Sequence, residues 1–234
     1  MNKIPLLFLL FSIATSVAAV AAAPKEVTPD EVDGYKFGIE QGCRETAIKA
    51  GRTWEQGDSV CSCTMETLSR NFTFRDWQRA VKPEGVANGV LEKQILLEHA
   101  DKTKKCITSR DAQHAAGKIA RVPSLIGRWE WVMPSGCVES YTFKPGGAVD
   151  ITSGEEKTSN MVEISPTPEK SGRHKFAMKI LKDNGGADCS KKTTDDTGKT
   201  NSGYLMMNFD ATMMAMCTTA DGTVCMGPLK RKRK

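Results

Sequence analysis

Histidine is scarce in this chain, with three residues among 234. Because imidazole is the side chain best suited to proton transfer near neutral pH and is the commonest metal ligand, this shortage disfavours histidine-based chemistry. His99 and His114 match no nucleophile pattern, and we interpret both as structural. The acidic pairs Glu155–Glu156 and Asp195–Asp196 are poor acid–base couples, since adjacent residues on a strand face opposite ways.

Recognisable catalytic motifs are missing as well. The sequence contains no nucleophile elbow, no P-loop, no zinc-binding helix motif and no dinucleotide fingerprint. We therefore predict a protein that is not an enzyme, with no catalytic residue, no metal site and no cofactor. Charged residues (26%) and hydrophobic residues (39%) occur at ordinary soluble levels, which argues against wholesale disorder and against a polytopic membrane protein.

Long apolar runs are confined to the N-terminus. Lys3 precedes an apolar stretch from Ile4 to Val20, and the small residues Ala21–Ala23 stand before Pro24. This pattern is typical of a secretory signal peptide that is cleaved near Ala23. A membrane anchor is the alternative, but the stretch is near the lower length limit for spanning a bilayer. We expect a periplasmic or secreted protein with no transmembrane segment after signal removal.

Cysteine is plentiful by comparison, and the predicted export determines the expected state of its thiols. Thiols in an oxidising compartment form disulfides, so eight cysteines predict a disulfide framework. Four lie in the first half of the chain and four in the second: Cys43, Cys61, Cys63, Cys106, Cys137, Cys189, Cys217 and Cys225. Because each half can close its own bridges, the split favours two domains.

Charge divides the chain in the same way. Residues 24–120 carry 15 basic and 15 acidic side chains, whereas residues 121–234 carry 17 and 13. The run Lys230–Lys234 supplies the excess, so the body of the second half is close to neutral. Nucleic-acid binding needs a basic face spread over a fold, and we therefore exclude it. We interpret the run as a solvated tail, with weak attraction to anionic surfaces as an alternative.

The first half has the spacing of helices. Thr28 and Glu31 form a capping box around Pro29, which predicts a helix start. A second helix is expected to begin near Asp58 or Ser59, and a weaker capping box at Thr73–Asp76 starts a third. Apolar residues at helical spacing then predict one longer helix from about Val86 to Cys106.

Cys61 and Cys63 are separated by a single residue. On a helix their side chains point about 200° apart, so they are not expected to bridge each other. Each can reach a different neighbour, one Cys43 and the other Cys106, and the spacing leaves the assignment open. A metal site or a redox pair are the alternatives, but redox motifs usually place two residues between the cysteines.

From Leu125 onward the pattern changes to that of strands. Apolar residues alternate with polar ones, and turn sequences such as Pro145-Gly146-Gly147 and Asn184-Gly185-Gly186 separate the segments. A hairpin turn at 220–222 would place Cys217 opposite Cys225, which leaves Cys137 for Cys189. Seven or eight short strands of this kind predict an antiparallel meander that closes into a barrel.

The start of the first strand carries a motif. Gly127-Arg128-Trp129 resembles the G-x-W opening of lipocalins and related calycins. The resemblance covers residues 125–229 and implies a small β-barrel whose tryptophan closes one end. It also implies a basic side chain over that ring, for which Lys230 and Arg231 are the candidates.

Methionine is concentrated near the C-terminus, with six residues in 21 positions: Met206, Met207, Met213, Met214, Met216 and Met226. We interpret them mainly as core packing, with a flexible apolar ligand surface and copper binding as alternatives. Met206 and Met214 or Met216 are expected to point into the barrel. Together with Trp129 and Trp131 they are the candidate ligand or barrel-end residues.

The longest irregular stretch of the second half is rich in acidic residues and glycine, between Asp183 and Asn201. Its oxygens could hold calcium, but the EF-hand spacing is absent. We interpret it as a solvated loop and a candidate contact surface.

These observations predict an α+β fold in which a disulfide-stapled helical domain precedes a small antiparallel, lipocalin-like β-barrel. The expected segments are a signal peptide (1–23), a helical domain (24–112), a linker (113–124), the barrel (125–229) and a basic tail (230–234). The favoured function is non-catalytic binding of an unknown protein partner, as an inhibitor or immunity protein. The alternatives are a carrier of a small apolar ligand in the barrel and a hydrolase or thiol redox enzyme.

Overall fold

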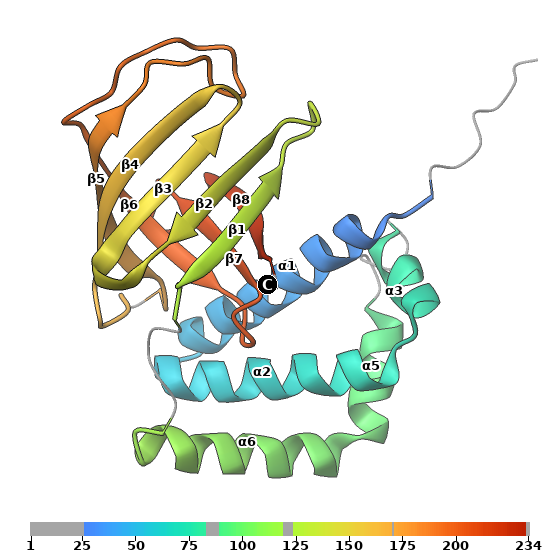
Figure 1. Ribbon diagram of the computed structural model, residues 1–234. Coiled ribbons are helices and arrows are strands. Elements are labelled where there is room, and N and C mark those ends of the chain that lie inside the picture. The colour runs from blue at the N-terminus through green and yellow to red at the C-terminus, as the bar shows by residue number, and fades with distance from the viewer. Residues whose placement is uncertain (1–25, 83–88, 119–123, 170, 233–234) are drawn as a thin grey trace, which may run out of the picture.

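The computed structural model describes residues 26–82, 89–118, 124–169 and 171–232. Within these ranges, α-helices come first and an antiparallel barrel follows (Figure 1), so the expected α+β fold is confirmed. The proposed signal peptide over 1–23 lies outside the described residues. The helices are α1 (Pro29–Lys49), α2 (Trp54–Asn71), α3 (Phe74–Val81), α5 (Val90–Glu98) and α6 (Ala100–Ala115). The strands are β1 (Gly127–Val132), β2 (Val138–Phe143), β3 (Ala148–Ser153), β4 (Glu156–Ile164), β5 (His174–Asp183), β6 (Thr200–Met207), β7 (Met213–Cys217) and β8 (Cys225–Arg231).

Capping boxes start the first three helices. Those at Thr28 and Thr73 confirm the sequence prediction. The third is at Thr53, whose hydroxyl accepts from the Gln56 backbone amide at 3.3 Å while the Gln56 side chain accepts from the Thr53 amide. The expected start of α2 near Asp58 is therefore wrong, because the chain enters the helix as soon as its first amides have side-chain acceptors.

The expected single helix from Val86 to Cys106 is also wrong. Its described part consists of α5 and α6, which meet at His99, where φ is −112° and ψ is 21°. The apolar spacing continues across this residue, so sequence periodicity alone does not reveal the break. The second of the two helices continues to Ala115, beyond the expected domain end at residue 112.

Two disulfides attach the neighbours of α2 to it. Cys43 of α1 pairs with Cys61, and Cys63 pairs with Cys106 of α6, which settles the assignment that the sequence leaves open. The sulfurs of α2 diverge as the helical spacing requires, and both cysteines are fully buried. Around them α1, α2 and α3 share an apolar cluster: Val32, Met65, Leu68, Phe72, Trp77 and Ala80.

The eight strands form a closed barrel in simple meander order. Closure is made by β1 and β8, where Trp129 lies opposite Arg231 and Glu130 opposite Lys230. The basic tail was expected to begin at residue 230, but the strand β8 continues through the first two of these residues. Lys230 and Arg231 belong to the last strand, and the Lys232 amide donates to the Arg128 carbonyl oxygen at 2.8 Å. Residues 233 and 234 lie outside the described ranges.

One end of the barrel is closed by Trp129. Its side chain is fully buried, and its Nε1 donates to the Leu125 carbonyl oxygen at 2.8 Å. The Arg231 guanidinium lies 4.7 Å from the ring centroid and also contacts the carbonyl oxygen of Ser124. A basic side chain of the last strand therefore covers the tryptophan, as the lipocalin resemblance implies. The surrounding core is apolar, with Phe143, Val149, Leu205, Met214 and Leu229.

The opposite end is bordered by loops. The longest one joins β5 to β6 and is the orange loop at the top of the barrel in Figure 1. The Cys137–Cys189 disulfide ties it to the start of β2. Ala187 accepts hydrogen bonds from the amides of Glu155 and Glu156, and a Cβ on Gly154 would lie 2.8 Å from the same oxygen. This loop is thus fixed to the β3–β4 turn at the rim.

The fourth disulfide, Cys217–Cys225, joins the facing residues of β7 and β8. Both bridges of the barrel match the pairing expected from the sequence. Together the bridges account for all eight cysteines, which is typical of an extracellular or periplasmic protein. Among the described helices, none combines the length and the hydropathy needed to cross a bilayer.

The methionines do not all face inward. Met214 and Met216 belong to the core inside the barrel, whereas Met206 packs on the outer face against Phe37 of α1. The expected inward orientation of Met206 is therefore wrong. Alternate residues of a strand share a face, so Met206 lies on the same side of β6 as Tyr204. In the neighbouring strand β7, a register shift between Met214 and Met216 changes the pairing with β8.

The helical part rests on this outer face. In Figure 1, α1 lies between the barrel and α2, and α6 lies farthest from the barrel. Arg44 donates to the Met207 carbonyl oxygen at 2.6 Å, and Arg173 of the barrel pairs with Glu45. At the other end of α1, Lys230 contacts Asp30 at 2.6 Å and Asp33 at 2.8 Å. Polar contacts therefore hold both ends of α1 to the barrel.

We expect Trp129→Ala to lower the free energy of unfolding by about 3–5 kcal/mol, because it leaves a cavity in the closed end and removes the ring beneath Arg231. Denaturant unfolding followed by circular dichroism would measure the loss. Val132→Ala on the same strand is the control, since Val132 is exposed and its truncation should cost no more than about 0.5 kcal/mol. Equal effects of the two variants would contradict the role given to Trp129.

Candidate functional site

The end of the barrel away from Trp129 contains a cavity of about 820 Å³. Its lining comes from the seven strands β2–β8 and from the β5–β6 and β7–β8 loops. The wall includes Glu139, Tyr141, Ile151, Ser153, Glu156, Thr158, Asn160, Phe176, Met178, Ile180, Met216 and Met226, with Asp188, Lys192, Asp196 and Lys199 from the loop. The volume lies within the range of small-molecule sites.

The strand register arranges the lining in levels. At the rim, Glu139, Ser153 and Glu156 face one another across β2, β3 and β4. Tyr141, Ile151 and Thr158 form the next level. Because alternate residues of a strand share a face, these levels are two residues apart, and the cavity becomes less charged with depth.

The rim is rich in carboxylates. Glu139, Glu156, Asp188 and Asp196 line it, against the two lysines Lys192 and Lys199. Lys199 is paired with Asp196 at 2.7 Å. Burial raises the pKa of Glu156, and the negative charges of Asp183, Asp188, Asp196 and Glu139 raise it further. The local field at the rim therefore favours a positive charge.

Glu139 is held in a fixed orientation. The Tyr141 hydroxyl donates to Oε2 at 3.0 Å, and the Ser153 hydroxyl donates to Oε1 at 2.9 Å. Burial, together with the neighbouring Glu139 charge, raises the pKa of Tyr141 well above its ordinary value. The tyrosine hydroxyl therefore stays protonated and keeps its hydrogen bond to the carboxylate.

The deepest polar group of the lining is Asn160. Its residue is 2% exposed, and Nδ2 donates to the Val149 carbonyl oxygen at 3.2 Å and to Thr158 Oγ1 at 2.8 Å. Oδ1 is buried and has no hydrogen-bond partner. The amide orientation is fixed by the Val149 carbonyl, which can only accept. A buried acceptor of this kind is satisfied only when a donor reaches it.

The candidate residues from the sequence occupy different places. Met216 lines the cavity, whereas Trp129 and Met214 belong to the closed end. Trp131 is half-buried and packs against that apolar core, and Met206 lies on the outer face.

Sequence reasoning missed the polar lining, above all Glu139, Glu156 and Asn160. The alternation along β4 could have identified them. Glu156, Thr158 and Asn160 lie on the same face of this strand as Val162, which points into the barrel. The polar residues of that face are unusual for a barrel filled only by its own side chains.

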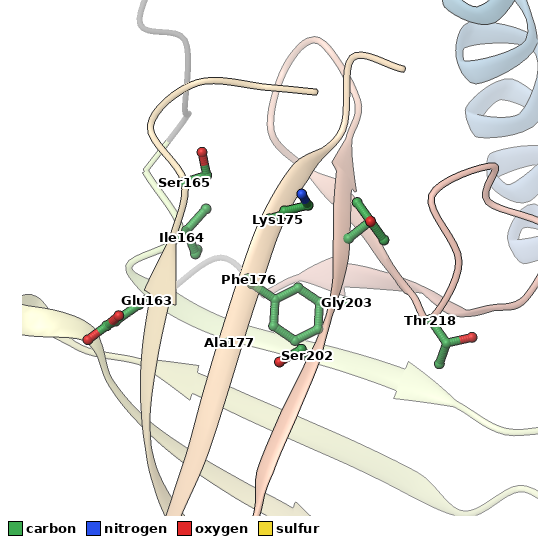
Figure 2. Close-up of a pocket in the computed structure, with 10 residues that line it drawn as sticks. Glu163, Ile164, Ser165, Lys175, Phe176, Ala177, Ser202, Gly203 and Thr218 are labelled. Atoms are coloured by element: carbon green, nitrogen blue, oxygen red, sulfur yellow. The ribbon is translucent and has the colours of Figure 1, made fainter. Parts of the chain in front are cut away.

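A second hollow of about 610 Å³ lies across β4, β5 and β6. Figure 2 shows the Phe176 ring beside Gly203, with Lys175 above the ring and Glu163 to its left. Lys175 is paired with Glu169 at 2.7 Å. Unlike the barrel cavity, this hollow offers no buried polar atom without a partner among the described residues.

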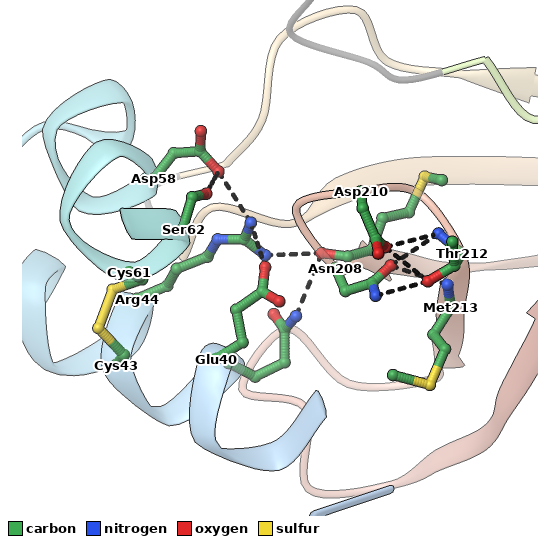
Figure 3. A network of polar contacts seen from close by, with 12 residues as sticks. Glu40, Cys43, Arg44, Asp58, Cys61, Ser62, Asn208, Asp210, Thr212 and Met213 are labelled. Carbon is green, nitrogen blue, oxygen red and sulfur yellow. Dashed lines mark hydrogen bonds and ion pairs between the residues drawn. A yellow bond between two sulfur atoms is a disulfide. The ribbon is translucent and has the colours of Figure 1, made fainter. Parts of the chain in front are cut away.

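A buried charge network occupies the helical part, where α1, α2 and α6 meet. Figure 3 shows its contact between Asp58 of α2 and Arg44 of α1, at 2.8 Å. Asp58 also pairs with Arg110 at 3.1 Å and with His114 Nε2 at 3.1 Å. Burial opposes ionisation of Asp58, but the two arginines outweigh it and lower its pKa. Arg44 also contacts Glu40 at 2.6 Å. These contacts are internal, and we assign the network to stability.

Glu40 differs from Asp58 in its ionisation. Burial raises the pKa of Glu40 to about 7, although the Arg44 charge opposes the shift, while the charges of Asp58 and Asp210 add to it. The carboxyl lies next to the β6–β7 turn at Phe209, where α1 meets the barrel. Its protonation is therefore coupled to this contact.

Searches against protein-family models, curated proteins and solved structures found no significant match. Among the described residues, no group of three or more His, Cys, Asp or Glu is arranged to hold a metal ion. The chemistry of the site therefore has to be argued from its own geometry.

Glu40 should make stability depend on pH. Below pH 4.5 the group is protonated in both the folded and the unfolded chain. As the pH rises towards 7, the unfolded chain loses this proton first, so stability falls by about 3 kcal/mol and then levels off. We expect Glu40→Gln to remove this decline, measured by urea unfolding between pH 4.5 and 7.5. Glu98→Gln, at an exposed site, should leave the decline unchanged. A decline that persists in Glu40→Gln would show that another group causes it.

Proposed function

We propose that this protein binds a small ligand inside the barrel and does not transform it chemically. One observation carries the proposal, namely a cavity of about 820 Å³ that is closed at one end by an apolar core and bordered at the other by loops. Sites of this size and shape bury most of the surface of a small molecule. The carrier function, an alternative at the level of sequence, thus becomes the first candidate.

The lipocalin resemblance supports the same function. The Gly127–Trp129 motif begins an eight-stranded antiparallel barrel, and Arg231 covers the tryptophan. We propose that the barrel is of the lipocalin type. Barrels of eight strands are just wide enough to hold one small ligand. The cavity lining, rather than the fold, carries the functional argument.

We further propose that the protein acts in the periplasm or outside the cell after removal of residues 1–23. The sequence pattern of that segment and the four disulfides support this location. A ligand carrier in such a compartment has access to small molecules from the environment.

A protein-binding function of the inhibitor or immunity type is the second candidate. It is favoured by α5, which has no buried residue and exposes Val90 (65%) and Leu97 (68%). Exposed apolar side chains on one helix suit a protein contact. The thiol redox alternative has less support, since Cys61 and Cys63 are fully buried in two different disulfides.

Filling the cavity should abolish ligand binding. We expect the mature chain to bind the neutral apolar dye Nile red saturably, and Met178→Trp to weaken this binding at least about tenfold by occupying the space. Fluorescence titration measures the affinity. The matched control is Met161→Trp on the outer face of β4, which adds the same ring outside the cavity.

Thermal unfolding of both variants checks that the barrel remains folded. Equal loss of dye binding in the two tryptophan variants would contradict binding in the cavity. If neither the dye nor the compounds named below bind the native chain, the carrier function is wrong and the protein-binding candidate takes its place.

A further inference from the structure

We propose that the ligand is an elongated amphipathic amine, with an ammonium group at the rim, an apolar body in the barrel and a hydrogen-bond donor at its inner end. This inference rests on the proposed function and specifies its ligand. It follows from the position of polar groups at the two ends of the cavity and of apolar groups between them.

The inner end of the cavity favours a ligand with a hydrogen-bond donor. Asn160 Oδ1 is an acceptor, is buried and has no partner, while the Nδ2 of the same amide is already used by Val149 and Thr158. A hydroxyl or amine of a ligand can donate to this oxygen once the Asn160 side chain, which lines the cavity, turns its Oδ1 towards the space. A purely hydrocarbon ligand would instead seal it away from water without a hydrogen bond, which is unfavourable.

The rim of the cavity favours a positively charged group on the ligand. Four carboxylates and two lysines line the cavity, and one lysine is already paired with Asp196. Glu139 of β2 and Glu156 of β4 project at the same level, on either side of Ser153 of β3. An ammonium between them would relieve the repulsion from neighbouring carboxylates, which adds to the effect of burial in raising the pKa of Glu156. A carboxylate ligand such as a fatty acid would increase that repulsion.

The wall between the two ends is apolar. Three strands supply these apolar side chains, namely β3 with Ile151, β5 with Phe176, Met178 and Ile180, and β7 with Met216. Methionine side chains adapt to irregular apolar surfaces. This section of the wall suits an alkyl chain or another narrow apolar body.

The spacing of the polar groups sets the length of the ligand. Glu156 and Asn160 are four residues apart on the same face of β4, which corresponds to about 13 Å along a strand at roughly 3.3 Å per residue. A ligand must therefore span several carbon–carbon bonds between its charged end and its donor. A small cation alone cannot reach both groups.

The test uses four eight-carbon probes on the full mature chain, namely octylamine, octanol, octanoate and aminooctanol. Isothermal titration calorimetry at neutral pH gives each affinity. We expect octylamine to bind at least about tenfold more tightly than octanoate, as a charge-assisted contact at the rim requires. Aminooctanol, with a hydroxyl at its inner end, should bind about threefold to tenfold more tightly than octylamine.

Two variants assign the contacts to residues. Glu156→Gln should reduce the preference for octylamine over octanoate severalfold, whereas Glu163→Gln should leave it unchanged. Both variants remove one negative charge from β4, but Glu163 faces outward. Asn160→Leu should abolish the advantage of aminooctanol over octylamine. The comparison of these two probes on the native chain tests the inner donor without any substitution.

The possible negative results distinguish failure of the amine inference from failure of the carrier function. Equal affinity for octylamine and octanoate would overturn the amine inference and leave the carrier function in place. A preference for the amine that Glu156→Gln and Glu163→Gln reduce equally would indicate attraction to the surface and also overturn it. If none of the four probes and no dye binds, the proposed function itself is wrong.

Discussion

Closure of the sheet between β1 and β8 is the constraint on which the cavity depends. Trp129 pairs with Arg231 and Glu130 with Lys230, and the Lys232 amide donates to the Arg128 carbonyl oxygen. The Arg231 guanidinium also covers the Trp129 ring. A cation over a buried, desolvated ring is worth more than an exposed ion pair. Without the pairing of β1 with β8, both strands would be open edges, and the inward-facing polar residues of the other strands would face solvent instead of a cavity.

Local signals in the sequence predict most of the fold. The capping boxes at Thr28 and Thr73, the turn sequences of the second half and the pairing of Cys217 with Cys225 depend on residues close in the chain, and the structure confirms them. The basic run shows the limit of such reasoning. As a charge cluster it indicates a solvated tail, yet Lys230 and Arg231 pair with residues far away in sequence that composition cannot identify.

The candidate site was harder to predict for a physical reason. Whether a strand residue faces the cavity depends on the register of the whole barrel, and a shift by one residue exchanges the two faces. Met206 was therefore expected inside and lies outside, against α1. The unpartnered oxygen of Asn160 depends on the positions of Val149 and Thr158, which only the folded barrel brings together. Composition alone does not identify Asn160 as part of a site.

The two ends of the barrel differ in a way that packing alone does not require. At the closed end, apolar side chains fill the space around Trp129 and its Nε1 donates to Leu125, while the buried Nε of Arg231 has no hydrogen-bond partner. At the other end, the chain fixes a carboxylate with two hydroxyls at Glu139 and leaves a buried acceptor at Asn160 without a partner. Unsatisfied buried polar atoms are costly, so a stable barrel gains nothing from this arrangement by itself. A ligand that supplies the missing donor and a positive charge would turn the same groups into specific contacts, and for this reason we propose that the polar lining serves binding rather than folding.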